Sequence, residues 1–324
     1  MAIRLVTYRH SEDVPPLPGN DIFYSTDVFR LLERTTDYDV MLIVAYDGDC
    51  IIGKLLAVTR NTFKYLRFWK KTIVFGTGEY FSDGIKSEDI FSEMISYLVA
   101  LKKDDTMLFE FRNLEESLFG YKYFRENKFF PVRWLRVINS IHYHHFDQWM
   151  SQSRKKQISR ALAAGAELCE ATSVVDIKAA FRMMKHYYTA RPHNYFPDFS
   201  FFNALMSYRA EHDLGKMFLV KYKGKIIGCS ACIFSGDKAF LLFVGGMNKS
   251  YPLLHPCALA VWKAMLYSHS KGFRYFEFIN AGLPFRKWGY RDFILRFGGK
   301  QLSSRRWIRL NCGWLNNLLI KLYI

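Results

Sequence analysis

The segment FEFRN at Phe109–Asn113 nearly recurs as FEFIN at Phe276–Asn280. A match of this length is weak evidence alone, because phenylalanine-rich strands resemble one another by chance. The neighbouring sequence decides between coincidence and a duplicated fold. Three more pairs of segments match in the same order, namely YDGDCIIG (Tyr46–Gly53) with YKGKIIG (Tyr222–Gly228), GYKYF (Gly120–Phe124) with GYRDF (Gly289–Phe293), and RWLRV (Arg133–Val137) with RWIRL (Arg306–Leu310). The chain is therefore an internal duplication, with repeats predicted at residues 1–147 and 148–324.

Composition favours two packed globular domains. The chain has 324 residues, of which 50% are hydrophobic and 17% aromatic, enough for two domains with cores of their own. No run of about eighteen apolar residues suggests a membrane span, and the start MAIRLVTYRH lacks the apolar core of a secretory signal. We therefore expect a cytoplasmic protein with reduced thiols.

The six cysteines show no spacing typical of a disulfide framework. Cys229 and Cys232 form a C-x-x-C pair inside the predicted strand IIGCSACIF, where residues three apart point to opposite faces. They cannot hold one metal ion together, so we predict buried structural thiols and no metal site.

The formal net charge of +16 is the strongest clue in the composition. Such a surplus raises the local concentration of anionic partners and speeds their association. Nucleic acid such as tRNA, a phosphorylated carrier, a CoA-type donor and an anionic membrane surface all meet this description. A soluble basic protein without such a partner is the alternative.

Hydrophobic periodicity predicts the order strand, helix, helix, three-stranded meander, helix, strand, helix, strand in the second repeat, and the first repeat follows it. The fold class is thus α+β (α/β), with two tandem units that each hold a mixed, mostly antiparallel sheet flanked by helices. In the second repeat the elements are expected at residues 166–172, 174–188, 199–211, 216–222, 225–234, 238–246, 254–272, 273–280, 286–295 and 303–311.

This order of elements resembles the GNAT acyltransferase fold, and two such units in one chain resemble the Fem (FemAB-like) aminoacyltransferases. The basic helix and glycine turn of Ser153–Leu168 are similar to the segment that opens the second unit in that family. So is the helix, glycine and aromatic-acidic strand of Leu253–Asn280. The resemblance implies transfer of an acyl or aminoacyl group to an amine of an anionic acceptor, with a peptidoglycan precursor as the expected one. The donor would be aminoacyl-tRNA or acyl-CoA, with no tightly bound cofactor.

Two features depart from the families. GNAT enzymes hold the CoA pyrophosphate with a Gln/Arg-x-x-Gly-x-Gly/Ala loop before a helix, and neither VGGMNKSYPLLH nor FGTGEYFSDGIKSED fits that pattern. Fem relatives often carry a lysine before a Phe-Gly pair near the end. The pair here is Phe297-Gly298, Ile294 stands where the lysine is expected, and Arg296 or Lys287 could replace it.

Acyl transfer to an amine requires a deprotonated amine, a stabilised oxyanion and a protonated leaving group. The second repeat offers three candidates, of which Glu277 could act as base or instead pair with a nearby arginine such as Arg274. His255 starts a helix, whose positive end would keep its imidazole neutral, although it could be an ordinary polar residue there. Tyr290 could protonate the leaving group, yet Tyr121 takes the equivalent place in the first repeat, which also suits a packing role.

The remaining candidates are binding residues. For the substrate we predict Arg191, Asn194, Tyr195, Asn280, Arg286 and Lys287, and for the donor Gly245, Gly246, Arg154 and Lys155. The first three belong to the polar loop YYTARPHNYFPD, which could equally be an ordinary surface loop, and the basic helix could be a solvated face. The tail WLNNLLIKLYI is predicted as a short helix docked on the body of the protein.

We therefore predict a tandem acyltransferase whose second unit is active. An acetyl-CoA-dependent N-acetyltransferase with an atypical donor loop is the second interpretation. A non-catalytic protein that keeps the fold and binds polyanions is the third. The oligomeric state has no signal in the sequence.

Overall fold

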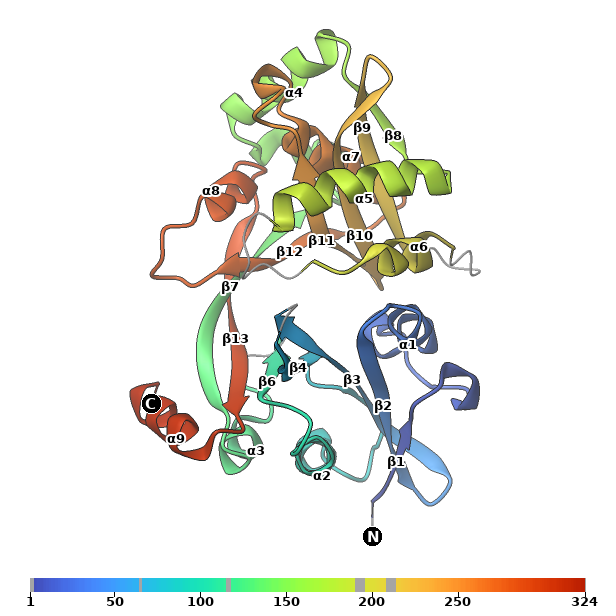
Figure 1. The fold of residues 1–324 in the computed structure, drawn as a ribbon, viewed down its shortest axis with the longest axis vertical. Helices are drawn as coiled ribbons and strands as arrows, with labels where there is room; N and C mark the ends of the chain where they lie inside the picture. Colours follow the sequence, from blue (N-terminus) through green and yellow to red (C-terminus); the bar gives the residue numbers. More distant parts are fainter. Residues whose placement is uncertain (1–2, 64–65, 115–117, 190–195, 208–213, 324) are drawn as a thin grey trace. The chain divides into compact units, whose positions relative to one another are not determined.

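The computed structural model describes residues 3–63, 66–114, 118–189, 196–207 and 214–323 (Figure 1). They form two compact units. Unit 1 comprises Met1–Trp134 together with Ser303–Ile324, and unit 2 comprises Leu135–Leu302. Each holds a mixed, mostly antiparallel sheet flanked by helices, which confirms the predicted fold class.

In the sheet of unit 1 the neighbouring strands β4 and β6 run parallel, and the other described pairs are antiparallel. The strand order is β1 (Arg4–Tyr8), β2 (Tyr38–Asp47), β3 (Cys50–Phe63), β4 (Leu66–Phe75), β6 (Leu108–Arg112) and β13 (Lys300–Leu310), and β5 (Glu79–Tyr80) pairs with β3. The helical segments are η1 (Ser11–Asp13), η2 (Ile22–Tyr24), α1 (Thr26–Glu33), α2 (Ser87–Leu101), α3 (Tyr121–Glu126) and α9 (Gly313–Leu322).

The core of unit 1 lies between the sheet and the helices α2 and α3. Along β6, strand alternation turns Phe111 toward these helices and Glu110 to the opposite face. Phe111 packs against Phe91 of α2 and Phe124 of α3, with ring centroids 6.1 and 5.1 Å apart. Trp307 of β13 is fully buried and stacks on Phe124 at 4.6 Å, so the end of the chain completes this core.

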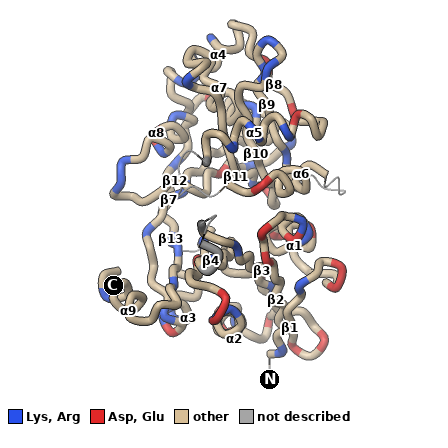
Figure 2. Tube along the Cα trace, viewed as in Figure 1, with Lys and Arg blue, Asp and Glu red and all other residues tan. Residues whose placement is uncertain are grey.

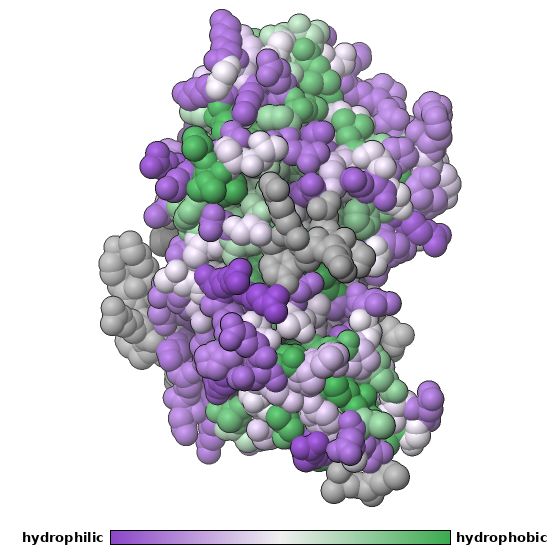
Figure 3. Space-filling view, turned by 90° about the vertical axis from the view of Figure 1, so that its right-hand side faces the viewer, coloured by the Kyte–Doolittle hydropathy of each residue, from purple (hydrophilic) through white to green (hydrophobic). Residues whose placement is uncertain are grey.

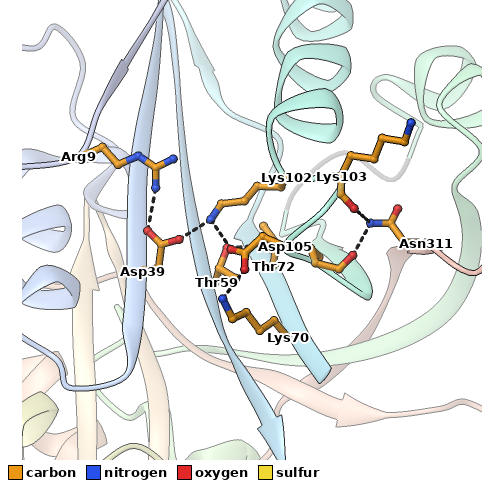
Figure 4. A network of polar contacts seen from close by, with 10 residues as sticks. Arg9, Asp39, Thr59, Lys70, Thr72, Lys102, Lys103, Asp105 and Asn311 are labelled. Atoms are coloured by element: carbon orange, nitrogen blue, oxygen red, sulfur yellow. Dashed lines mark hydrogen bonds and ion pairs between the residues drawn. The ribbon is translucent and has the colours of Figure 1, made fainter. Parts of the chain in front are cut away.

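A polar network ties the end of α2 to strands from both ends of the chain (Figure 4). The buried Lys102 ammonium lies between the carboxylates of Asp39 on β2 and Asp105. Asn311, which follows β13, donates a hydrogen bond to the carbonyl of Lys103 at 2.8 Å. The last segment of the chain is therefore an integral part of unit 1.

Unit 2 has the sheet order β7 (Phe130–Ser140), β12 (Tyr275–Gly282), β11 (Lys238–Gly246), β10 (Lys225–Ser235), β9 (Gly215–Tyr222) and β8 (Glu167–Glu170). Its helical segments are η3 (Phe146–Trp149), α4 (Gln152–Ala163), α5 (Val174–Thr189), α6 (Phe199–Ser207), η4 (Pro252–Leu254), α7 (Pro256–Ser270) and α8 (Gly289–Leu295). Helices α5 and α6 cover one face of β9–β11, and α7 covers the other (Figure 1).

The predicted meander of β9, β10 and β11 is confirmed, as is the helix cap at Ser173, whose hydroxyl accepts the N–H of Asp176 at 3.1 Å. Cys229 faces α5, with its sulfur 3.9 Å from the Ala180 carbonyl oxygen, whereas Cys232 packs in the core on the α7 side. The two thiols thus point to opposite faces, as predicted. Among the described residues no group of three His, Cys, Asp or Glu side chains could hold a metal ion.

Helix α7 begins and ends at the predicted signals. Pro256 takes its first position, where the missing N–H costs nothing, and Gly272 follows its end with φ +81°. Gly228 of β10 lets α7 approach the sheet, because a Cβ there would lie 2.7 Å from the Pro256 carbonyl oxygen. Ser230 then donates a hydrogen bond to the Ala260 carbonyl at 2.8 Å. The start of α7 is therefore held firmly against the sheet.

The two repeats exchange their last strands. The first repeat ends with β7, whose second half belongs to unit 2 and pairs with β12. The second repeat ends with β13, whose second half belongs to unit 1 and pairs with β6. The compact units are therefore divided differently from the sequence boundary between residues 147 and 148, because each repeat contributes one strand to the sheet of the other.

Lys and Arg residues are spread along both units (Figure 2), and apolar patches on the face shown in Figure 3 are interrupted by polar side chains. In the described residues, no helix has both the length and the apolar character needed to cross a membrane. Helix α9 docks on unit 1 through buried Asn316, which accepts the N–H of Leu310 at 2.9 Å and donates to the Lys128 carbonyl at 2.9 Å.

Candidate active site

The two parallel strands of unit 2 separate part-way along their length. In the described residues, strands β11 and β12 pair only from Lys238, which lies opposite Tyr275, to Phe240, which lies opposite Glu277. Both strands continue beyond that point, and no pairing between them follows in the described part of the chain. The two strands thus splay apart in a V, at the place where the sequence predicts acyl transfer.

The equivalent strands of unit 1 stay together. Strands β4 and β6 are in register from Lys71–Leu108 to Phe75–Arg112, and the Gly76 N–H donates to the Arg112 carbonyl at 2.8 Å. Across this described stretch the strands do not part, so the open V is a property of unit 2.

The helix that follows the V also differs between the units. In the first turn of α2 stand Glu88 and Asp89, whereas the first turn of α7 contains no acidic residue. A helix N-terminus attracts anions through its free N–H groups and its dipole, and carboxylates placed there compete with a ligand. The first turn of α7 therefore lacks the carboxylates that would repel an anion at the start of α2.

The loop before α2 is filled by side chains of its own unit. Glu79 pairs with the buried Lys54 at 3.0 Å and accepts the N–H of Asn20 at 3.1 Å. The N–H of Gly78 donates to the hydroxyl of Tyr24 at 2.9 Å. These internal bonds occupy groups that a donor phosphate would otherwise use.

Glu277, the predicted base, lies at the point where β11 and β12 separate. Its carboxylate is fully buried and pairs with the Arg136 guanidinium of β7 at 2.9 Å. It points away from Phe276 and Phe278, which pack in the core on the α7 side, as the strand alternation predicts. Arg274, the partner considered in the sequence, instead lies over the ring of Tyr275 at 5.8 Å. The buried ion pair favours a structural role for Glu277.

His255 immediately precedes α7 in an unusual backbone conformation. Its φ of +45° lies in the left-handed region of backbone conformation. Residues other than glycine rarely adopt this conformation, and where they do it often marks a functional position. Burial lowers the pKa of His255, and the charge of Arg154 lowers it further. The imidazole is therefore neutral at pH 7 and can accept a proton.

Tyr290 and its counterpart Tyr121 have different surroundings. Burial raises the pKa of Tyr290, and the neighbouring Tyr188 and Cys257 raise it further. Tyr121 is 41% exposed and packs on Trp307, with ring centroids 5.2 Å apart. The same position in the two repeats thus has two environments, because burial shapes that of Tyr290 and Tyr121 is exposed.

Two residues near the V were not among the predicted site residues. Tyr188 of α5 donates its hydroxyl hydrogen to the Val244 carbonyl of β11 at 3.2 Å, and burial raises its pKa to about 12. Cys257 lies in the first turn of α7, accepts a hydrogen bond from the Asn248 amide at 3.1 Å, and has a pKa raised by burial to about 11. Tyr188 belongs to the segment YYTARPHNYFPD, whereas no local pattern marks Cys257, whose neighbours come from other elements.

Arg154, predicted to bind the donor, is 3% exposed. Its guanidinium donates to the Phe293 carbonyl and to the Gln157 amide oxygen, both at 3.0 Å, and lies over the rings of Phe293 and Phe297 at 4.6 and 4.7 Å. These acceptors are neutral, and Nε makes no hydrogen bond within the described residues. A buried positive charge therefore lies where it influences His255 and Cys257.

Lys155 points elsewhere, because it pairs with Asp147 at 3.7 Å. Arg296, considered as a replacement for the missing lysine, follows α8, and its charge helps burial to lower the pKa of Arg154 to about 10. Lys287 is exposed in the loop between β12 and α8. The structure thus brings Arg296, and not Lys155, to Arg154.

Gly245 and Gly246 end β11 where helices approach the strand. A Cβ on Gly245 would lie 2.8 Å from the Met184 side chain of α5, and one on Gly246 would lie 3.0 Å from Pro256 and from the backbone nitrogen of Cys257. Close packing therefore accounts for both glycines. Gly245 allows α5, and Gly246 the start of α7, to lie directly against β11.

The predicted substrate residues have different positions. Asn280 is exposed on β12 beyond the point of separation. Arg286 is exposed in the next loop, and its carbonyl accepts a hydrogen bond from Arg291 at 2.6 Å. Arg191, Asn194 and Tyr195 lie outside the described residues.

Comparison with known proteins agrees with this geometry. Residues 152–287 match the family model of the acetyltransferase (GNAT) domain, a range that includes β11, α7 and β12. A structure of FemX aligns with a TM-score of 0.64 at 12% identity, over 94% of both chains. The chain is a tandem GNAT-fold protein. The predicted likeness to the tandem GNAT fold, shared with FemX, is thus confirmed.

Two further solved structures align over most of the chain. The C-terminal domain of a putative lysylphosphatidylglycerol synthetase from Agrobacterium fabrum aligns with a TM-score of 0.58 at 13% identity, over 94% of this chain and 91% of that one. A tandem GNAT protein from the clavulanic acid biosynthesis pathway aligns with a TM-score of 0.57 at 9% identity, over 96% of this chain and 99% of that one. No curated protein matches the sequence.

Proposed function

We propose that this protein transfers an acyl or aminoacyl group to an amine in the open V of unit 2. The observation that carries the proposal is the separation of β11 from β12 after Phe240–Glu277, in contrast to the continuous pairing of β4 with β6. The match of residues 152–287 to an acetyltransferase domain supports acyl transfer as the reaction class.

The proposed roles follow from the protonation states of the side chains around the start of α7. Neutral His255 takes a proton from the attacking amine, the amine nitrogen bonds to the acyl carbon, and the bond from that carbon to the leaving group breaks. Protonated Tyr290 gives its proton to the leaving group. The positive charge of Arg154 and the dipole of α7 attract the phosphates of the donor.

Tyr290 and Tyr121 provide a matched test of which unit is active. Removing the acid in Tyr290→Phe should reduce the transfer rate by about 100-fold or more at unchanged fold, because general acid catalysis contributes roughly 10²–10⁴-fold. Tyr121→Phe should retain activity. The measurement is single-turnover transfer to an amine acceptor, with circular dichroism as the check on folding. Loss of activity in Tyr121→Phe alone would place the chemistry in unit 1.

The donor is proposed to be a large polyanion such as aminoacyl-tRNA, because the donor loop lacks the pyrophosphate-binding pattern and the net charge is +16. Many Lys and Arg contacts to phosphates make affinity fall steeply with salt. We therefore expect weak binding of acetyl-CoA at physiological salt and strongly salt-dependent binding of charged tRNA. Ligand binding measured with both donors over a salt series checks this. A peptidoglycan precursor is the first acceptor to test.

An acetyl-CoA-dependent N-acetyltransferase is the second candidate, favoured by the acetyltransferase family match. Tight acetyl-CoA binding that changes little with salt would select it. Salt-dependent polyanion binding without transfer from either donor would instead identify a non-catalytic binding protein with the same fold.

A further inference from the structure

A charged cluster lies on the face of the unit 1 sheet opposite α2 and α3. We call it the basic cluster, and it consists of Lys71 on β4, Arg112 on β6 and Arg306 on β13, all in contact with Glu110. Lys71 pairs with one carboxylate oxygen of Glu110, whereas Arg112 at 3.1 Å and Arg306 at 2.7 Å share the other. Three neighbouring strands thus direct cations to a single carboxylate.

The basic cluster holds more positive than negative charge. Lys71 and Arg112 alone bring two charges to the one carboxylate of Glu110, which is 2% exposed. Burial lowers the pKa of Lys71 to about 8, with Glu110 opposing this shift and Arg112 adding to it. Charge that is not balanced is costly to bury, and a bound anion would lower that cost.

Comparison of the repeats identifies Arg112 as the source of the surplus. Glu110 lies opposite Ile308 on β13, and Glu277 lies opposite Ile138 on β7. Arg306 precedes Ile308 by two residues and Arg136 precedes Ile138 by two, so the two arginines hold equivalent positions. Lys71 likewise corresponds to Lys238. Lys71 lies opposite Leu108, two residues before Glu110, and Lys238 lies opposite Tyr275, two residues before Glu277. Arg112, however, corresponds to Ile279, the one position at which FEFRN and FEFIN differ. At this position unit 1 has a cation and unit 2 has an apolar side chain.

A neutral donor accompanies these charges. The Arg306 guanidinium lies over the Trp134 ring at 3.6 Å from the centroid, and the buried indole N–H of Trp134 has no acceptor among the described residues. Lys71 and Arg112 keep 17% and 23% of their side chains exposed, which leaves a route for a ligand from solvent. Cations that reach solvent are what a phosphate group requires, and the indole N–H of Trp134 is a further donor next to Arg306.

We propose that the basic cluster is a phosphate-binding site, separate from the transfer site of unit 2. Its ligand carries a phosphate or diphosphate group, from either a soluble nucleotide or the headgroup of an anionic lipid. A phosphate brings about two charges and several acceptor oxygens, and so matches the surplus better than a carboxylate does. The site stands independently of the chemistry proposed above.

The test measures binding of inorganic pyrophosphate to the full chain by calorimetry, at ionic strength held constant with sodium chloride. Arg112→Ile, which gives unit 1 the residue of unit 2, should weaken binding roughly tenfold or more, because a charge-assisted hydrogen bond is lost. Lys71→Gln should do the same. Lys122→Gln on α3, which removes a 75% exposed lysine from the same unit, should bind as the wild type does.

Uridine diphosphate and dihexanoyl phosphatidylglycerol form two further arms of the experiment, and the one that Arg112→Ile weakens identifies the source of the phosphate. Arg112→Ile should fold, because Glu110 keeps Lys71 and Arg306 as partners; Arg112→Gln serves as the second variant if it does not. The proposal is overturned if pyrophosphate does not bind at millimolar concentration, or if the Arg112 and Lys71 variants bind as well as Lys122→Gln.

Discussion

Glu110 and Glu277 hold the same place in the two repeats and differ in the charges around them. Strand alternation is enough to predict that both point away from the phenylalanines that flank them. Their partners could not be predicted, because Arg136 lies 141 positions from Glu277 and Arg306 lies 196 positions from Glu110. A carboxylate in a strand therefore reveals its face from sequence, whereas its role depends on long-range neighbours.

Glu277→Gln separates a structural role from a catalytic one. Removing one partner of a buried ion pair leaves the other charge uncompensated, so we expect the free energy of unfolding to fall by about 3 kcal/mol. Urea denaturation followed by tryptophan fluorescence measures this change. Arg274→Gln is the control, because that exposed side chain is not in the pair. Unchanged stability together with complete loss of transfer would instead make Glu277 the base.

At the scale of elements, the sequence predicts most features that depend on neighbouring residues, such as the positions of strands and the ends of helices. Hydrophobic periodicity and turn residues place the β9–β11 meander, and Pro256 and Gly272 mark the two ends of α7. The opening of the V was expected only from resemblance, since strand pairing depends on residues far apart in the chain. Cys257 and Tyr188 escaped prediction for the same reason, because their environment is built by several elements.

Helices α2 and α7 stand at equivalent places in the two repeats and differ in their first turns. Both helices follow the third strand of a meander, yet the first turn of α2 carries Glu88 and Asp89. The N–H of Gly120 donates to Glu88 at 2.8 Å, and the hydroxyl of Tyr123 donates to Asp89. In unit 1 these carboxylates hold α3 in place, so the start of α2 serves as a packing contact.

At the scale of the whole molecule, the duplication explains why each compact unit needs both halves of the chain. A repeat that folded alone would pair its own last strand with its own Phe-Glu-Phe strand, so that β7 would lie beside β6 and β13 beside β12. In this protein β13 pairs with β6, and β7 pairs with β12. Similar sequences in the two last strands, RWLRV and RWIRL, are compatible with this exchange, because each fits an equivalent place in the other unit.

The exchange predicts that the separate repeats do not fold. Fragment 1–147 lacks Trp307, which is fully buried in the core of unit 1, and leaves the edge of β6 open to aggregation. Fragment 148–324 lacks Val137 and Ile141, both fully buried in the core of unit 2. We expect each fragment alone to be insoluble or to show no cooperative thermal transition, and the two expressed together to give a folded complex. Fragment 1–147 with residues 300–324 attached through a Gly-Ser linker should fold alone, since it regains β13. Cooperative unfolding of unmodified fragment 1–147 would show that the exchanged strand is dispensable.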